Sequence, residues 1–293
     1  MTVKIARNSG FCFGVKRAIK IALDAAKNKK DIVTLGPIIH NHQMVTKLEN
    51  EGIYKVDKPA EINGRPTIIR SHGVEKEIMD LLEKNGIEII NATCPYVSKT
   101  QQVAKELHEK GFQVLIMGDQ DHPEVIALRS YVEGDAIVVN NASELLNKKF
   151  KKIGVISQTT KHINDLEEIV KVLVSRCEEL YVVNTICNAT AVRQNSTTNL
   201  AKESDLMIVI GGKNSSNTKM LAKICRKFVE TYHIETESEI DEKWFKAKKN
   251  IGITAGASTP DWVIVEVFNK INKCMGNNIE VDDINDIPGF KEE

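Results

Sequence analysis

Three cysteines in this chain share one sequence setting, in which a short apolar run precedes the cysteine and a helical pattern follows it. They are Cys12, Cys94 and Cys187, and successive members are 82 and 93 positions apart. The similar spacing predicts one structural unit repeated three times, with each copy contributing a thiol to a shared centre. Three thiolates leave one open position on a four-site metal centre, and an open position is typical of a catalytic metal rather than a structural one.

The remaining three cysteines have a different setting. Cys177, Cys225 and Cys274 lie within or at the end of helical patterns. A lone cysteine on a helix is most often a small core residue, so these three are not expected to bind a metal. For the first set, zinc held by three thiolates and a water stays open as an alternative, because spacing alone does not distinguish zinc from an iron–sulphur centre.

The segments that must position the three cysteines repeat in one order. A helical pattern follows each cysteine, at residues 15–27, 97–110 and 191–203. An apolar run ending in glycine comes next, at residues 31–36, 112–118 and 205–212. Two more short strand patterns follow in each copy, and in the first two copies a last strand leads into the next cysteine. These further strand patterns lie at residues 53–57, 66–70, 87–91, 136–140, 152–157, 180–184, 232–236 and 250–256.

The strand patterns predict an α/β protein. Short runs rich in valine and isoleucine are typical of strands buried on both faces, and their alternation with helices predicts parallel sheets. We expect three similar parallel-sheet lobes in a pseudo-threefold trefoil. The expected lobes are residues 13–93, 94–186 and 187–293.

The third copy has no clear last strand of its own. Residues 279–283 are a weak candidate, and residues 3–7 form a strand pattern directly before Cys12. We therefore expect the N-terminal segment 1–12 to pack into the third lobe and close the ring. The polar tail after Asp283 is expected to lie on the surface or to fray.

Polar loops follow the first and third strands of each copy, where parallel sheets bind their ligands. The side chains that could bind or act there are His40, His72, His122, Glu124, Thr159, Ser215, Ser216, Asn217 and Ser258. Hydroxyl, amide and imidazole groups together suit an anion with many acceptor oxygens, and helix N-termini bind phosphate readily. For any single serine or asparagine, ordinary helix capping is the alternative.

Two helix starts are expected within these loops. Ser216 or Asn217 would cap a helix that begins near Thr218, and Ser258 or Thr259 would cap a helix with Pro260 at its first position. Glu124 would lie at the start of a helix, where the helix dipole favours a carboxylate. As a proton donor it would need an environment that raises its pKa, or a relay.

Composition excludes several classes of protein. The 293 residues are 42% hydrophobic and 27% charged, with 40 basic and 40 acidic side chains, which argues against nucleic acid or a membrane surface as the main partner. The first ten residues lack the apolar core of a signal peptide, and no run is long and apolar enough to span a membrane, so we expect a cytoplasmic protein. Neither GxxxxGK[ST] nor GxGxxG occurs, so ATP, NAD and FAD have no motif here.

Taken together, the loop and cysteine motifs resemble one known family. The stretches GFCFGVKRAI, GPIIHN, IRSHGV, NATCPYVSK, GDQDHPEV, SQTT, NTICNAT, GGKNSSNT and AGASTPDW run from residue 10 to residue 262. They are similar to those of the LytB/IspH family of 4-hydroxy-3-methylbut-2-enyl diphosphate reductases in the non-mevalonate isoprenoid pathway. The combination is specific, although no single stretch would be.

The resemblance implies a site and its cofactor. Cys12, Cys94 and Cys187 would ligate one central [4Fe–4S] cluster per chain, whose fourth iron is free for the substrate's hydroxyl. Substrate-binding positions of the family correspond to His40, His72, His122, Thr159, Ser215, Ser216, Asn217 and Ser258. Catalytic positions, which handle the hydroxyl and deliver the proton, correspond to Glu124, Thr159 and His122.

The resemblance also implies a reaction and partners. The reaction would be reductive dehydroxylation of (E)-4-hydroxy-3-methylbut-2-enyl diphosphate to isopentenyl and dimethylallyl diphosphate. An external one-electron donor, ferredoxin or flavodoxin, would supply the electrons. We expect a monomer or a weak dimer. Two alternatives stay open at this point, a zinc-dependent hydrolase of a phosphorylated substrate and a non-enzymatic iron–sulphur redox sensor.

Overall fold

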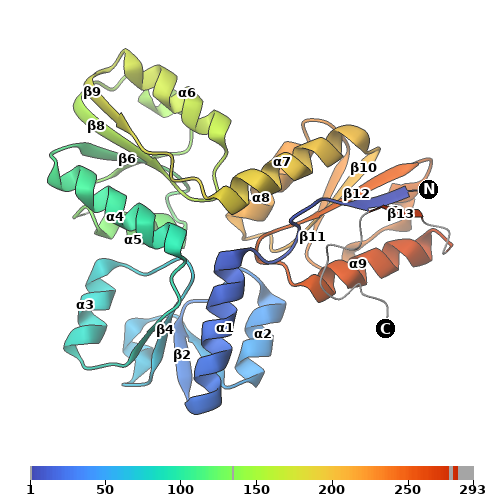
Figure 1. Ribbon diagram of the computed structural model, residues 1–293, viewed down its shortest axis with the longest axis horizontal. Coiled ribbons are helices and arrows are strands. Elements are labelled where there is room, and N and C mark those ends of the chain that lie inside the picture. The colour runs from blue at the N-terminus through green and yellow to red at the C-terminus, as the bar shows by residue number, and fades with distance from the viewer. Residues whose placement is uncertain (1, 134, 277–279, 283–293) are drawn as a thin grey trace. The chain divides into compact units, whose positions relative to one another are not determined.

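The computed structural model describes residues 2–133, 135–276 and 280–282 (Figure 1). Over these ranges, short strands alternate with helices and form three separate sheets in which every strand pair is parallel. The predicted α/β class with three parallel-sheet lobes is confirmed. The three sheets share one order of four strands: the second strand of each copy lies at one edge, followed by the first strand, the third strand and a last strand. The third sheet has one more strand beyond the last.

The first sheet has the order β3-β2-β4-β5. Its strands are β2 (Ile32–Leu35), β3 (Ile53–Val56), β4 (Thr67–Ile69) and β5 (Ile89–Asn91). The helices of this part of the chain are α1 (Phe13–Asn28), α2 (His42–Asn50), α3 (Lys76–Lys84) and the short η1 (Pro59–Ile62). Leu82 of α3 packs with Leu35 and Ile69 in one buried cluster, so α3 covers one face of this sheet.

The second sheet has the order β7-β6-β8-β9. Its strands are β6 (Gln113–Met117), β7 (Ile137–Val139), β8 (Phe150–Ser157) and β9 (Cys177–Val182). Its helices are α4 (Pro95–Glu109), α5 (Pro123–Ser130), the short η2 (Ala142–Leu145) and α6 (Ile163–Val174). Leu115 of β6 packs toward α6, whereas Val114 and Ile116 pack toward α4 and α5, because successive strand residues face opposite sides. Figure 1 shows the resulting three layers, with α6 on one side of the strands and α4 and α5 on the other.

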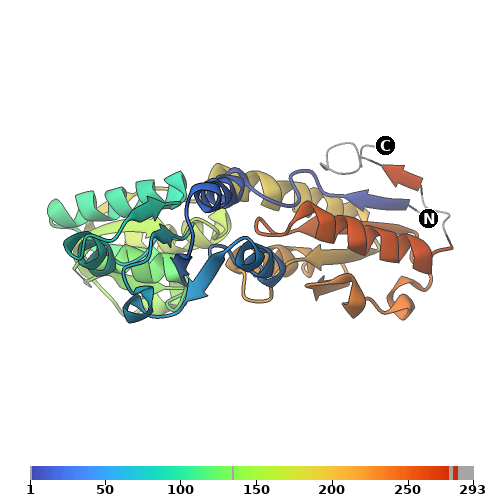
Figure 2. The same ribbon diagram turned by 90° about the horizontal axis from the view of Figure 1, so that it is seen from below.

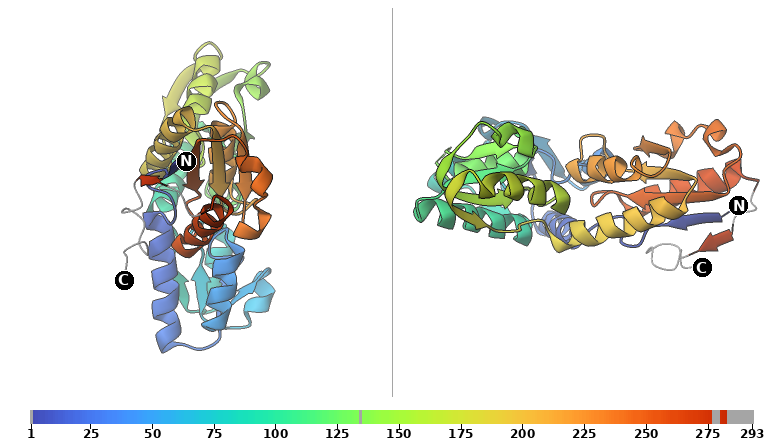
Figure 3. Two further views of the ribbon diagram at one scale, coloured as in Figure 1. Left: turned by 90° about the vertical axis from the view of Figure 1, so that its right-hand side faces the viewer. Right: turned by 90° about the horizontal axis from the view of Figure 1, so that it is seen from above.

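The third sheet has five strands in the order β11-β10-β12-β1-β13. They are β1 (Thr2–Ile5), β10 (Leu206–Ile210), β11 (Thr231–Ile234), β12 (Asn250–Ala255) and β13 (Glu280–Asp282). Its helices are α7 (Asn188–Glu203), α8 (Ser216–Cys225), η3 (Glu237–Glu239), η4 (Glu242–Phe245) and α9 (Asp261–Cys274). Leu206 and Ile208 pack toward α9, whereas Met207 and Val209 pack toward α7 and α8, so helices again cover both faces (Figure 3).

The N-terminal strand β1 belongs to this third sheet. Thr2 to Ile5 pair with Asn250 to Ile253 of β12, so β1 occupies the position that β5 and β9 hold in their sheets. On its other side β1 pairs with β13, which Figure 2 shows as the red strand beside the blue one. Residues 279 and 283 of the weak strand candidate, and the polar tail, lie outside the described residues.

By its contacts the chain divides into two compact units. One holds residues 1–13, 40–42 and 188–293, and the other holds residues 14–39 and 43–187. The first and second sheets therefore share one unit, and the third sheet belongs to the other. The lobe boundaries expected at 93/94 and 186/187 stay a prediction. In the described ranges, no helix is both long and apolar enough to cross a membrane.

Candidate active site

The third strand of each sheet runs into a four-residue β-turn. The first turn spans residues 70–73, the second turn 158–161 and the third turn 256–259. In each, the N–H of the fourth residue donates to the carbonyl of the first, with N···O distances of 3.0, 3.1 and 3.0 Å in that order. The three turns are thus equivalent positions of a repeated backbone, and they lie at the carboxyl ends of parallel strands.

One cysteine lies against each turn. In every case the cysteine N–H donates to the carbonyl of the turn's second residue. The pairs are Cys94–Ser71 at 3.0 Å, Cys187–Thr159 at 3.1 Å and Cys12–Ala257 at 3.1 Å. The three cysteines directly precede α4, α7 and α1, and all three are partly exposed. A helix N-terminus stabilises a thiolate, so this setting suits metal ligands.

The other cysteines have no such setting. Cys225 is buried in α8, and burial raises its pKa to about 12, which keeps it a thiol. Cys274 is the last residue of α9. The expectation that Cys177 lies in a helical pattern is wrong, because it is the first residue of β9 and packs against the α6 side of the second sheet. Among the described residues, Cys12, Cys94 and Cys187 are therefore the cysteines that combine partial exposure, a helix start and a shared turn contact.

These three residues fit an iron–sulphur cluster. Soft thiolate ligands bind such clusters, and three of them leave one iron without a protein ligand. The fit rests on the chemistry of the donors and on the equivalence of their three backbone settings. The described residues contain no fourth cysteine in this setting.

Glu124 and Thr159 form a buried pair of a carboxyl group and a hydroxyl. Glu124 is the second residue of α5, directly after Pro123, and is 1% exposed. The Thr159 N–H donates to its Oε1 at 2.7 Å, and the Thr159 hydroxyl donates to its Oε2 at 2.9 Å. Both bonds favour the carboxylate, yet burial outweighs them and raises the pKa of Glu124 to about 7. The sequence expectation of a carboxylate at a helix start is correct, and its partner is the second residue of the second turn.

His122 precedes this pair as the N-cap of α5. Its Nδ1 accepts the N–H of Glu124 at 3.2 Å, so the proton of the neutral ring is on Nε2, which is a donor. The ring of His72, the third residue of the first turn, meets that of His122 edge-on with the ring centroids 5.5 Å apart. The compact unit of the first two sheets therefore brings together two imidazoles, a buried acid and its hydroxyl partner.

The remaining candidates lie in the unit of the third sheet, where α8 begins. Ser215 is the N-cap, and its hydroxyl accepts the N–H of Thr218 at 3.3 Å. The expected cap at Ser216 or Asn217 is wrong, because α8 starts two residues earlier than predicted. Asn217 is 4% exposed, and neither its side-chain oxygen nor its nitrogen has a hydrogen-bond partner among the described residues. A buried amide without a partner at a helix N-terminus indicates a place for a polar ligand.

The third turn carries Ser258 and supports His40. The Ser258 hydroxyl donates to the backbone carbonyl of His40 at 3.1 Å. Gly212 brings a second loop close to the same carbonyl, because a Cβ added there would lie 2.9 Å from it. The predicted cap of the last helix is wrong, because Pro260 itself is the N-cap of α9 and neither Ser258 nor Thr259 caps it. The Thr259 hydroxyl instead donates to the carbonyl of Ile210, at the end of β10.

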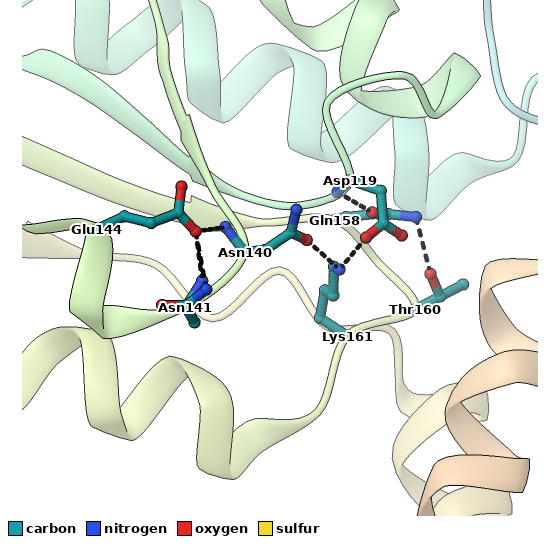
Figure 4. A network of polar contacts seen from close by, with 7 residues as sticks. All are labelled: Asp119, Asn140, Asn141, Glu144, Gln158, Thr160 and Lys161. Atoms are coloured by element: carbon teal, nitrogen blue, oxygen red, sulfur yellow. Dashed lines mark hydrogen bonds and ion pairs between the residues drawn. The ribbon is translucent and has the colours of Figure 1, made fainter.

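A polar network around the second turn was not predicted from the sequence (Figure 4). The Lys161 ammonium donates to Asp119 Oδ1 at 2.6 Å and to Asn140 Oδ1 at 2.9 Å. The Gln158 side chain accepts the N–H of Asp119 at 3.0 Å and donates to the hydroxyl of Thr160 at 3.1 Å. Lys161 follows the SQTT stretch directly, so only its position beside a functional loop could have drawn attention to it.

Comparison with known proteins gives one family. Residues 3–272 match the family model described as LytB protein. A relative from Caldanaerobacter subterraneus subsp. tengcongensis, named 4-hydroxy-3-methylbut-2-enyl diphosphate reductase, is 46% identical over 285 residues. That alignment covers 95% of this chain and 99% of the relative.

Two solved structures are similar over nearly the whole chain. One is described as (E)-4-hydroxy-3-methyl-but-2-enyl diphosphate reductase, the terminal enzyme of the non-mevalonate pathway, and is 42% identical with a TM-score of 0.67. It matches over 93% of this chain and 100% of its own. The other is the E-1-hydroxy-2-methyl-but-2-enyl-4-diphosphate reductase from Plasmodium falciparum, 26% identical with a TM-score of 0.88 over 99% of this chain and 95% of its own.

Proposed function

Because the chain belongs to the LytB protein family, we propose that it reduces (E)-4-hydroxy-3-methylbut-2-enyl diphosphate to isopentenyl and dimethylallyl diphosphate. In this reaction the bond between C4 and its hydroxyl oxygen breaks and the oxygen leaves as water. A C–H bond forms at one end of the allylic system, and the products differ in which end takes the proton. Overall, two electrons and two protons are consumed for each substrate molecule.

The observation that carries the proposal is the buried Glu124–Thr159 pair. A proton donor works best when its pKa is near the operating pH, and burial raises the pKa of Glu124 to about 7. The Thr159 hydroxyl, which donates to Glu124 at 2.9 Å, is in a position to pass that proton on. We assign Glu124 as the acid that protonates the departing hydroxyl, and Thr159 as the group that contacts that hydroxyl and relays the proton.

The diphosphate is assigned to the polar groups at the start of α8 and to the histidines. The unsatisfied amide of Asn217 and the N-terminal N–H groups of α8 suit phosphate oxygens. His122 offers an Nε2–H donor, and we expect similar donation from His40 and His72. Ser215, Ser216 and Ser258 complete the proposed set. Binding of this remote group would orient the reacting carbon, so its binding energy would contribute to catalysis.

Cys12, Cys94 and Cys187 are the proposed ligands of one [4Fe–4S] cluster. When bound, such a cluster supplies a Lewis-acidic iron and a route for electrons. The equivalent contacts of the three cysteines with their turns support this ligand set. We further propose that a cytoplasmic one-electron donor, ferredoxin or flavodoxin, supplies the electrons, since the sequence has no nucleotide-binding motif.

The test is an anaerobic assay of the reconstituted protein. The protein is loaded with iron and sulphide, and oxidation of a reduced viologen dye is followed when the hydroxylated allylic diphosphate is added. We expect oxidation that depends on substrate, together with formation of both products. Protein that carries a full cluster and gives no oxidation would overturn the proposal. Zinc in place of iron after purification would favour the hydrolase instead.

A further inference from the structure

We propose that Lys161 is a positioning residue that sets the Thr159–Glu124 contact by tying together the two loops that carry these residues. The inference rests on the proposed function, because the contact matters for turnover only if Glu124 is the acid. Lys161 takes part in neither of the two hydrogen bonds that join Thr159 to Glu124. Its effect would be transmitted through the backbone of the two loops.

The first of these loops is the second turn. Its fourth residue, Lys161, closes the turn through the N–H bond to the carbonyl of Gln158 at 3.1 Å. Thr159 is its second residue, and that residue uses both its N–H and its hydroxyl on Glu124. A shift of the turn would therefore break both bonds to the acid together.

The other loop connects β6 to α5 and is itself a turn. The His122 N–H donates to the carbonyl of Asp119 at 2.9 Å, and the helix that carries Glu124 begins at the next residue. Asp119 is thus the first residue of the turn that leads into the acid. Gly118, just before it, allows close packing, because a Cβ there would lie 2.6 Å from Val125 and 3.3 Å from Gln158.

Two side chains join the turns at Asp119. At the start of the second turn, Gln158 accepts the Asp119 N–H at 3.0 Å, and at its end the Lys161 ammonium binds the Asp119 carboxylate at 2.6 Å. Figure 4 shows Lys161 between Asp119 and Asn140. Asn140 is itself held in place, because its backbone N–H donates to the Glu144 side chain at 2.9 Å. Three loops at one edge of the second sheet therefore converge on one ammonium group.

Burial makes this connection stiff. The Lys161 side chain is 9% exposed, while that of Asp119 is 45% exposed. A buried ammonium is costly unless its protons are bonded, so alternative positions of Lys161 are disfavoured. A surface ion pair with two mobile side chains would not constrain the backbone in this way.

The other turns differ at the same position. The fourth residue is Gly73 in the first turn, which has no side chain to reach a neighbouring loop. In the third turn it is Thr259, whose neutral hydroxyl binds the carbonyl of Ile210 at 3.0 Å. Of the three equivalent turns, the second binds the buried carboxyl group of Glu124. Its fourth residue, Lys161, is also a buried cation with two side-chain acceptors.

The test compares Lys161→Met with Lys171→Met in the reconstituted holoenzyme. Methionine keeps an unbranched side chain, one heavy atom shorter than lysine, and removes the charge. Lys171 forms an exposed ion pair with Glu168 on α6. We expect Lys161→Met to lower kcat by about 10-fold or more, since small misplacements of catalytic groups cost this much, while KM and iron content stay unchanged. Lys171→Met should match the wild type. Unchanged kcat in Lys161→Met would overturn the proposal.

A double mutant separates positioning from general loosening of the fold. If Lys161 acts through Glu124, then Lys161→Met should lower kcat no further once Glu124→Gln is present. An equal loss in both backgrounds would show that Lys161 acts elsewhere and would overturn the proposal. If Lys161→Met fails to fold, Asp119→Asn keeps an acceptor oxygen and removes its charge. It should give a smaller loss of kcat that also disappears in the Glu124→Gln background, and a loss that persists there would contradict the inference.

A readout that needs no turnover keeps the inference separate from the proposed function. Amide hydrogen exchange of the peptide spanning residues 157–162 reports the Thr159 N–H. Its exchange rate should rise at least 10-fold in Lys161→Met and stay at the wild-type value in Lys171→Met. If the wild type has a full cluster and no activity but this difference appears, the proposed function fails and the positioning contact stands. Unchanged exchange in Lys161→Met would reject the contact itself.

Discussion

The second and third turns have the same backbone and different chemistry. Each follows a third strand, closes with one hydrogen bond and accepts the N–H of a cysteine on its second carbonyl. In the second turn that second residue is Thr159, whose side chain and N–H both bind a buried acid. In the third turn it is Ala257, and the next residue, Ser258, binds the backbone that leads to α2. The repeated backbone thus fixes where the cysteines lie, while one or two side chains per turn decide what else each turn does.

The largest effect should come from the feature that all three turns share, which is the cysteine bound to each of them. Serine in place of Cys12, Cys94 or Cys187 should remove cluster iron and nearly all activity, because each thiol is a proposed ligand. The matched control is Cys225→Ser, at a thiol whose pKa is raised to about 12 by burial. Iron and sulphide analysis with the viologen assay checks both. Loss of iron in the control would mean that the ligand set is wrong.

The next largest effect should come from the buried acid Glu124, which binds the second turn and has no counterpart described at the other turns. Glu124→Gln keeps the shape of the side chain and removes its proton, so turnover should fall by a factor on the order of 10² or more with substrate affinity largely intact. In the wild type, kcat should be flat below about pH 7 and fall above it, as the acid becomes ionised. The exposed Glu167→Gln on α6 serves as the control. Near-normal turnover in Glu124→Gln would remove this residue from the proton path.

A smaller effect is expected in the unit that holds the third turn. Asn217→Ala should weaken substrate affinity by about 10-fold, or about 1.4 kcal/mol, because the buried amide is proposed to bind the diphosphate. Its amide makes no hydrogen bond among the described residues, so the loss of folding stability should be small. Binding can be measured by titration calorimetry, with the exposed Asn214→Ala as control and Ser258→Ala beside it. Unchanged affinity in both Asn217→Ala and Ser258→Ala would place the diphosphate elsewhere.

The smallest effect is a dependence of stability on pH that only the second turn should cause. The pKa of Glu124 is raised from 4.5 to about 7 in the folded protein, so between these values the folded state binds more protons than the unfolded state. Stability from this group is therefore present at low pH and lost as pH rises. Between about pH 5.5 and 6.5 the wild type should lose about 1 kcal/mol relative to Glu124→Gln. Denaturant unfolding of the two proteins at both pH values measures this, and parallel curves would contradict the raised pKa.

Much of the fold could be predicted because its signals are local. Short apolar runs identified the strands of all three sheets, and the setting of three cysteines identified the repeat. The ends of helices and strands were harder to predict, since capping depends on geometry beyond the nearest residues. Ser215 rather than Ser216 caps α8, and Pro260 rather than Ser258 caps α9. Cys177 was expected in a helical pattern but begins β9, because pairing with Phe150 of β8 outweighs the local preference.

The candidate site likewise has residues that the local sequence predicts and contacts that it does not. Glu124 and Thr159 could be proposed as functional residues from their loops, but their two hydrogen bonds join positions 35 residues apart, which no local pattern reveals. Lys161 was missed for a related reason. Its acceptors come from loops 42 and 21 residues away, and a lysine in a polar loop looks like a surface residue until those loops are assembled.

The placement of β1 has a consequence for how the protein is made. Thr2 to Ile5 leave the ribosome before any strand of the first two sheets, yet their partners in β12 begin at Asn250. This segment must therefore wait for its partners in the third sheet while the first two sheets, which end at Val182, are synthesised. Cys12 gains its hydrogen bond to Ala257 only after that wait. A chain cut short before β12 would lack this pairing, so loading of the proposed cluster would follow, rather than accompany, translation of most of the polypeptide.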